Sequence, residues 1–169
     1  KIHTQYSICE GALRTTDLAK YCKINKIKAV GLCDSNNLCG ALEFSETIAK
    51  SKTQPIIGTQ INIKYKDNIG KIPLFAKDLN GYKNLIKLSS KSFLEIKDDE
   101  EPHCKIEDLE KNYEGLILLS GTFDGLIGKL FFKNLTDEIS ALFKRFKIFF
   151  KDNFYLEIQR HRDRGEKLF

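Results

Sequence analysis

The sequence predicts an α/β fold with a largely parallel sheet that is buried on both faces. Short runs of β-branched and aliphatic residues alternate along the chain with longer segments of helical spacing. Two of these runs, 29–33 and 115–119, carry no polar side chain. Such runs are typical of parallel strands that helices cover on both sides. Hydrophobic residues make up 41% of the chain and charged residues 30%, which is a globular composition.

The first half of the chain contains the clearest strand and helix signals. Thr15, Thr16 and Asp17 precede a stretch of helical spacing, so we expect them to cap a helix. The run 29–33 predicts a buried strand that ends at Asp34. The apolar spacing then predicts a helix over 38–50, a strand over 55–65, a strand over 72–76 and a helix over 80–88.

The second half continues the same alternation. The segment 97–102 is acidic and turn-like, and it predicts a surface loop. After it we expect a helix over 106–112, a strand over 115–120, helices over 126–132 and 135–150, and a last strand over 153–159. Because no repeat, low-complexity tract or linker interrupts the pattern, we predict one domain over residues 1–169.

Composition excludes several classes of protein. No apolar run approaches the roughly 20 residues of a membrane-spanning helix, and residues 1–3 do not open a signal peptide. We therefore expect a cytoplasmic protein without membrane contact. No CxxC pair occurs, so neither a disulfide framework nor a zinc ribbon is indicated. The cysteines are expected to be mostly small buried hydrophobes; they are Cys9, Cys22, Cys33, Cys39 and Cys104.

Charge and local motifs add little about function. The net charge of +5 is compatible with nucleic-acid contact, but Lys is abundant together with Ile, Asn and Phe, as an AT-rich coding bias would produce. Neither a GxxxxGK[ST] phosphate loop nor a GxSxG elbow is present. The absence of any Met suggests a fragment that starts inside a longer chain.

Polar residues at the ends of predicted strands are the candidate site. In parallel α/β folds, chemistry collects at the carboxyl ends of the strands. Those positions are Asp34, Gln60, 120–122 and 159–161. Asp34 is either a metal ligand or the cap of the next helix. Glu157, Gln159 and His161 share one strand face, which suits either ligands or an exposed edge.

Taken together, these pieces resemble the polymerase-and-histidinol-phosphatase (PHP) domain at the N-terminus of bacterial DNA polymerase III alpha subunits. The order and spacing of the motifs hold across essentially the whole chain. They are 3–7 with 10–12, 29–34 with 37–44, 55–58, 76 with 80–85, 114–121 and 154–161. The family fold is a distorted (βα)7 barrel. The resemblance therefore implies an incomplete, TIM-like barrel that lacks its last strand–helix units.

The resemblance also implies a degenerate metal site. Metal-binding members hold up to three divalent ions and hydrolyse phosphoesters. Among the expected ligands His3, Asp34 and His161 remain, with Glu10 close to them in the first motif. Positions where ligands are expected carry Lys1, Ser35, Gln60, Lys71 and Thr122. Because two lysines would repel a divalent cation, we expect no bound cofactor; one residual Zn²⁺ or Mn²⁺ ion on the three remaining ligands is the alternative.

The implied function follows from the family. The chain would be the N-terminal region of a replicative DNA-directed DNA polymerase, whose Mg²⁺-dependent nucleotidyl transfer takes place downstream and whose DNA contacts lie in the parent protein. The segment itself would hold no catalytic residue. It would be a structural element and would bind a proofreading exonuclease subunit and other holoenzyme subunits. The alternatives are an active metal-dependent phosphoesterase or proofreading nuclease, and a free-standing scaffold.

An incomplete barrel also has a physical consequence. The chain would leave a parallel sheet edge unpaired, and such an edge is a template for association. We therefore expect the isolated chain to be marginally stable or to self-associate.

Overall fold

The computed structural model describes residues 1–97 and 99–159. Its helices and strands follow the predicted alternation. In chain order they are α1 (Thr15–Ile24), β1 (Ala29–Gly31), β2 (Asp34–Ser35), α2 (Ala41–Lys50), β3 (Gln54–Ile56), β4 (Gly58–Tyr65), β5 (Asn68–Ala76), α3 (Leu79–Leu94), β6 (Cys104–Lys105), α4 (Ile106–Lys111), β7 (Leu116–Leu119), α5 (Leu126–Phe132), α6 (Thr136–Phe150), the 3₁₀ helix η1 (Lys151–Asn153) and β8 (Phe154–Tyr155).

The large sheet is mixed, so the prediction of a largely parallel sheet holds only in part. Its strand order is β2-β4-β5-β7-β8, with β6 paired to β4, and a separate small sheet joins β1 to β3. The two long central pairings, β4 with β5 and β5 with β7, are antiparallel. The pairs β1–β3, β2–β4, β4–β6 and β7–β8 are parallel. Within the described part of the chain the sheet stays open, and no closed barrel is found.

The centre of the large sheet is antiparallel because β4 and β5 form a hairpin, which the sequence pattern does not indicate. Tyr65 pairs with Asn68, so only Lys66 and Asp67 form the turn. Lys66 has a φ of 53°, the left-handed value that two-residue hairpin turns require. Asn-Gly or Asp-Gly would have signalled such a turn, whereas Lys-Asp does not. As a result β5 begins at Asn68, four residues before the predicted strand.

Two helix starts differ in how they are capped. The predicted cap of α1 lies inside the helix, because Thr15 is its first residue and Arg14 occupies the N-cap without a side-chain bond. In contrast, Asp78 caps α3, and its Oδ1 accepts the backbone N–H of Gly81 at 2.9 Å. A carboxylate at this end also interacts favourably with the helix dipole.

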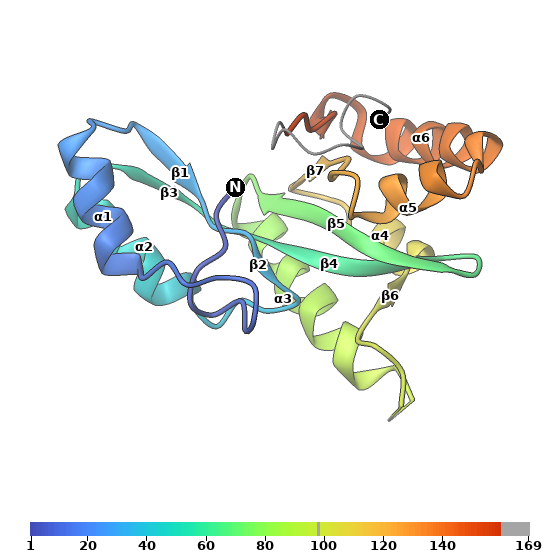
Figure 1. Cartoon of the computed structure of the whole chain (residues 1–169), viewed down its shortest axis with the longest axis horizontal. Coiled ribbons are helices and arrows are strands. Elements are labelled where there is room, and N and C mark those ends of the chain that lie inside the picture. Colours follow the sequence, from blue (N-terminus) through green and yellow to red (C-terminus); the bar gives the residue numbers. More distant parts are fainter. Residues whose placement is uncertain (98, 160–169) are drawn as a thin grey trace.

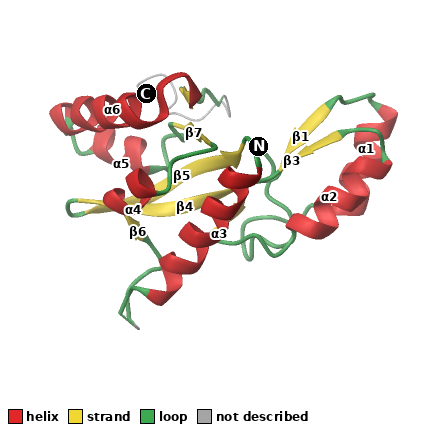
Figure 2. Ribbon diagram, turned by 180° about the vertical axis from the view of Figure 1, so that it is seen from behind, coloured by secondary structure: helices red, strands yellow, loops and turns green. Residues whose placement is uncertain are grey.

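The helices cover the two sheets in separate groups (Figures 1 and 2). Figure 1 shows α1 and α2 beside the small β1–β3 sheet at one end of the elongated molecule. Figure 2, from behind, shows α3, α5 and α6 beside the large sheet, and buried residues of all three helices share one core with its strands. Each group has its own apolar core. One is centred on Phe44 and Ile48 of α2, the other on Phe146 and Phe150 of α6 with the strands beneath them.

Other predictions have mixed outcomes. The last strand is shorter than predicted, since β8 ends at Tyr155. The short strand β6 was missed. Cys22, Cys33 and Cys104 are buried, as expected, whereas Cys9 and Cys39 are exposed. No helix within 1–97 and 99–159 is long and apolar enough to cross a membrane.

Candidate functional site: a polar centre

The N-terminal segment lies beside the end of the first strand. Ile2 bridges to Leu32 in parallel orientation. Its N–H donates to the carbonyl of Gly31 at 2.9 Å, and its carbonyl accepts the N–H of Cys33 at 2.8 Å. These bonds extend β1 by pairing it with the first residues of the chain. They place Lys1 and His3 next to the carboxylate that begins β2.

Loop 4–13, which follows, is held by hydrogen bonds at its ends and in its middle. Thr4 bridges to Leu13, and the N–H of Gln5 donates to the carbonyl of Leu13 at 3.0 Å. The hydroxyl of Tyr6 donates to Glu43 of α2 at 2.5 Å. Loop 4–13 therefore has a defined path across the ends of the strands, and its side chains point at fixed partners.

Asp34 is fully buried and is held by this loop. Its Oδ1 accepts the backbone N–H of Thr4 and the hydroxyl of Ser7, both at 2.6 Å. Its Oδ2 accepts the hydroxyl of Thr4 at 2.7 Å. The predicted cap is wrong, because the N-cap of α2 is Gly40, without a side-chain bond. Through these hydrogen bonds Asp34 joins the loop to the large sheet.

His3 stands beside Asp34 as a half-buried imidazole. Its Nδ1 is buried and has no hydrogen-bond partner within the described part of the chain. Burial lowers the pKa of His3, and the positive charge of Lys1 lowers it further, against the opposing effect of Glu10 and Asp34. The ring is therefore neutral near pH 7.

Lys71 meets the loop from the other side. The ammonium of Lys71, in β5, forms an ion pair with Glu10. The same carboxylate accepts the hydroxyl of Ser35, and Gln60 donates to Ser35 Oγ at 2.7 Å. Burial acts to raise the pKa of Glu10, but donation from Lys71 and Ser35 outweighs it, so the pKa lies below its ordinary value. Three of the positions where ligands were expected thus form one network with Glu10.

Lys1 pairs with a residue from the far end of the described chain. Its Nζ lies 3.3 Å from Glu157 Oε2, and each side chain is only 10% exposed. This is an ion pair without hydrogen-bond geometry, since Oε2 accepts no hydrogen bond from the described residues. Ser120 Oγ fixes the backbone of Glu157 by accepting its N–H at 2.9 Å. Gln159 donates to the other carboxylate oxygen at 2.5 Å, although both residues lie beyond β8 and not on the strand face predicted for them.

Asp124 completes the cluster, and the sequence pattern gave no reason to single it out. It accepts a hydrogen bond from Thr122, another position where a ligand was expected. Burial acts to raise the pKa of Asp124, but the Thr122 hydroxyl, a backbone N–H and the charges of Lys1 and Lys71 together bring it below its ordinary value. Asp124 and His3 both lie within the field of the two lysines. We call this cluster the polar centre: Lys1, His3, Glu10, Asp34, Lys71, Asp124 and Glu157.

A cavity among the described residues lies outside the polar centre. Its volume is about 320 Å³, and none of its walls belongs to the polar centre. Two of its cations already have partners: Arg145 pairs with Glu107 and Glu110, and Lys66 pairs with Glu138. The walls are Lys64, Tyr65, Lys66, Lys105, Ile106, Glu107 and Arg145.

A comparison with protein families identifies the kind of domain. The family described as "PHP domain" matches residues 1–161. The chain belongs to the PHP domain family.

Curated relatives of this PHP domain are named DNA polymerase III subunit alpha. The protein from Rickettsia prowazekii is 39% identical over 164 residues, covering 95% of this chain and 14% of the relative. The protein from Borreliella burgdorferi is 37% identical over 171 residues, with 95% and 15% covered. That from Haemophilus influenzae is 32% identical over 163 residues, with 95% and 14% covered. The chain spans about one seventh of the length of these relatives.

Among solved structures, one likeness is to a proposed metal-dependent phosphoesterase from Bifidobacterium adolescentis. It covers 54% of this chain and 31% of that chain, at 18% identity and a TM-score of 0.44.

The donor set of this PHP domain does not suit a metal ion. Asp34 already accepts three hydrogen bonds. Glu10 and Glu157 are each paired with an ammonium group, and His3 offers a single imidazole. Within residues 1–97 and 99–159, no group of three or more His, Cys, Asp or Glu side chains is arranged to hold a metal. His161, the third ligand predicted from the sequence, lies outside the described residues. No metal-assisted step is assigned to this site.

Proposed function

We propose that this chain is the N-terminal PHP region of a bacterial replicative DNA-directed DNA polymerase and that its own role is structural. In the parent protein, nucleotidyl transfer would depend on Mg²⁺ held outside this segment, and DNA would be bound there too. The PHP region would support the polymerase and bind a proofreading exonuclease subunit together with other holoenzyme subunits. The parent protein would act in the cytoplasm.

One observation carries the structural part of this proposal. Two lysines stand where ligands are expected, and each forms an ion pair with a carboxylate of the polar centre, Lys71 with Glu10 and Lys1 with Glu157. A hydrolytic centre needs carboxylates and imidazoles that are free to bind ions and an activated water. The polymerase part rests on relatives of that name that match 95% of the chain. The alternative of an active phosphoesterase is not favoured, because ammonium groups at ligand distance repel divalent ions.

Metal content and hydrolysis test the structural role. The chain is purified, dialysed against Mn²⁺ or Zn²⁺, freed of unbound ions and analysed for metal, and phosphatase activity is measured on p-nitrophenyl phosphate. We expect no stoichiometric metal and no metal-stimulated hydrolysis. Two or more ions per chain, together with hydrolysis that depends on them, would establish the phosphoesterase instead.

The reading frame that follows Phe169 tests the polymerase assignment. We expect it to continue into a long polymerase sequence with the aspartates that bind Mg²⁺ in nucleotidyl transfer. A stop codon directly after this segment would leave the free-standing scaffold as the remaining interpretation.

Exonuclease binding is tested separately. The purified chain and the exonuclease subunit of the same organism are mixed and analysed by size-exclusion chromatography with light scattering. We expect a one-to-one complex. If the two proteins elute separately at concentrations of about 10 μM, where micromolar complexes still form, the exonuclease role is wrong and the polymerase assignment stands.

A further inference from the structure

We propose that the ammonium groups of Lys1 and Lys71 serve as built-in cations of the polar centre and perform the structural task that bound metal ions would otherwise perform. The proposal rests on the part of the proposed function that denies metal chemistry to this site. It goes further because it assigns the two lysines a stabilising role. Each lysine joins two segments of the chain through an ion pair with a carboxylate.

The first pair is the more enclosed of the two. Lys1 and Glu157 are each 10% exposed, and they join the N-terminal segment to the segment that follows β8. An isolated charge in such surroundings is costly, whereas a paired one is tolerated. The backbone of Glu157 is fixed by Ser120, so its carboxylate does not have to be ordered by the lysine alone.

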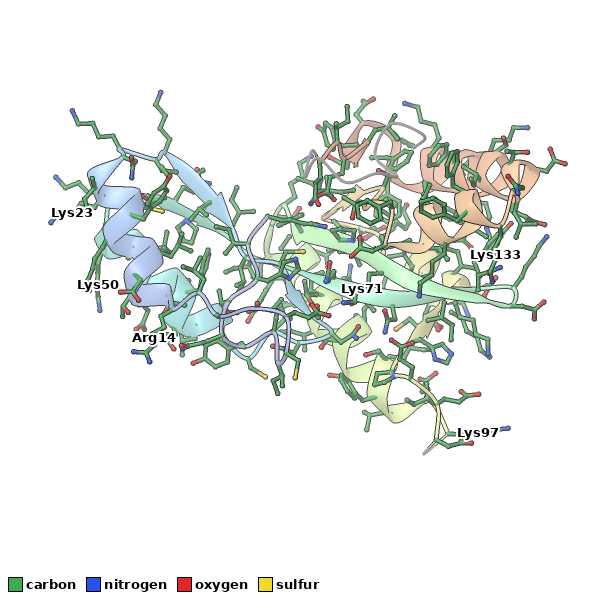
Figure 3. All side chains as sticks on the ribbon, in the orientation of Figure 1. Arg14, Lys23, Lys50, Lys71, Lys97 and Lys133 are labelled. Atoms are coloured by element: carbon green, nitrogen blue, oxygen red, sulfur yellow. The ribbon has the colours of Figure 1, made fainter. Side chains whose placement is uncertain are left out.

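The second pair joins other segments. Lys71 reaches from the middle of β5 to Glu10 in loop 4–13. Figure 3 shows Lys71 near the middle of the molecule, whereas the labelled Lys23, Lys50, Lys97 and Lys133 lie at its periphery. Glu10 also accepts the hydroxyl of Ser35, so a single carboxylate ties β2, β5 and the loop together. A divalent ion bound by side chains from several strands would produce the same kind of cross-link.

The charges explain why cations are needed here. Four carboxylates gather in the polar centre, and His3 contributes no positive charge because its ring is neutral. Without the lysines the centre would carry four negative charges in a partly buried space, and their repulsion would open it. Both lysines act on Asp124 as well as on their direct partners, so they neutralise the cluster as a whole. The four carboxylates are Glu10, Asp34, Asp124 and Glu157.

A double-mutant cycle on the enclosed pair tests this proposal. The variants are Lys1→Met, Glu157→Gln, the two combined, and Lys1→Arg, each compared with the parent chain by thermal unfolding. We expect Lys1→Met to lower the melting temperature by about 4 to 8 °C, because it leaves Glu157 charged and unpaired. The combined variant should lose clearly less than the sum of the two single losses. Lys1→Arg should stay close to the parent, since it keeps the charge.

Lys20→Met is the matched control. Lys20 also pairs with a carboxylate, Asp17, but the two side chains are 75% and 56% exposed. Its melting temperature should lie within about 1 °C of the parent, because exposed ion pairs contribute little. If Lys1→Met is too unstable to fold and the combined variant does fold, the unpaired carboxylate is the cause, and the proposal is supported.

Two outcomes overturn the proposal, and they are distinguishable. Strictly additive losses, with Lys1→Met and Lys1→Arg alike, would mean that Lys1 contributes packing and not charge; the proposed function would then survive. A parent chain that loses stability in EDTA and regains it with Mn²⁺ or Zn²⁺ would contain a real metal site, and the structural role itself would be wrong.

Discussion

Thr4 holds the carboxylate of Asp34 with two groups at once. Its backbone N–H donates to Oδ1 at 2.6 Å, and its hydroxyl donates to Oδ2 at 2.7 Å. A side chain thirty residues further along the chain is thereby fixed from both sides. Asp34 therefore links the N-terminal loop to the large sheet. Substitutions that separate its charge from its hydrogen bonding test this role.

Asp34→Asn should be much milder than Asp34→Ala. The Asn side chain still offers an acceptor to the N–H of Thr4, and the hydroxyls of Thr4 and Ser7 can rotate to suit its amide, so we expect a loss of about 1 to 2 kcal/mol. The Ala variant leaves three donors unpaired at a fully buried position and should lose about 3 to 5 kcal/mol. Urea unfolding measures both. Equal losses of unfolding free energy for Asp34→Asn and Asp34→Ala would show that the hydrogen bonds of Asp34 do not stabilise the fold.

The pKa of His3 predicts a dependence of stability on pH. Its folded-state pKa lies below the ordinary value of 6.5, because burial and Lys1 disfavour the charged ring. A group whose pKa is depressed by folding stabilises the fold above its unfolded pKa, and the contribution is lost as the pH falls through the folded pKa. Stability should therefore decline from about pH 7 toward about pH 5. His3→Gln should flatten this slope in urea titrations; an unchanged slope would point to another group.

Gly81→Ala should destabilise the packing of α3 against the start of β7. A Cβ atom at Gly81 would lie 1.8 Å from the backbone carbonyl oxygen of Gly115, which cannot move independently of the strand. We expect a loss of about 2 to 4 kcal/mol, measured by urea unfolding. Ser90→Ala, on the exposed side of the same helix, is the control and should change stability by less than about 0.5 kcal/mol. Similar losses of unfolding free energy for Gly81→Ala and Ser90→Ala would contradict the close approach of Gly81 to Gly115.

The end of the large sheet predicts self-association of the isolated chain. Within the described residues β8 pairs only with β7; its last residue, Tyr155, is 53% exposed, and the following Leu156 is 66% exposed. We expect the sedimentation coefficient and the melting temperature to rise with protein concentration. Leu156→Lys should weaken this effect, whereas Leu42→Lys on α2, at a residue that is 72% exposed, should not. A monomer whose melting is independent of concentration would refute the prediction.

The helices were the elements best predicted from the sequence. The segments 126–132 and 135–150 became α5 and α6 almost without change, because the spacing of their apolar residues matches one buried helix face. The mixed sheet was not predicted. Apolar runs indicate burial on both faces but say nothing about strand direction, and the Lys66–Asp67 turn carries none of the usual hairpin residues.

The polar centre was predicted in part. The rule that functional residues gather at strand ends singled out Asp34 and the segment 120–122, which lie at the polar centre. The lysines were expected to repel a cation, and the sequence offered no way to see that Glu10 and Glu157 would pair with them. Ion pairs between distant segments depend on the path of the loops, which local patterns do not specify. Asp124 was missed for the same reason.

The pair formed by Lys1 and Glu157 also sets an order of events during synthesis. Lys1 leaves the ribosome before Glu157, which follows roughly 10 to 30 s later at ordinary rates of translation. Throughout that interval the ammonium group of Lys1 lacks its Glu157 partner, so the small sheet and α1–α2 can form before this ion pair. Contacts between distant parts of a chain are costly to close early and so tend to form late. We therefore expect products that stop short of Glu157 to expose an unpaired Lys1 and a loosely held segment around it, features by which cellular proteases would distinguish them from chains that extend past Glu157.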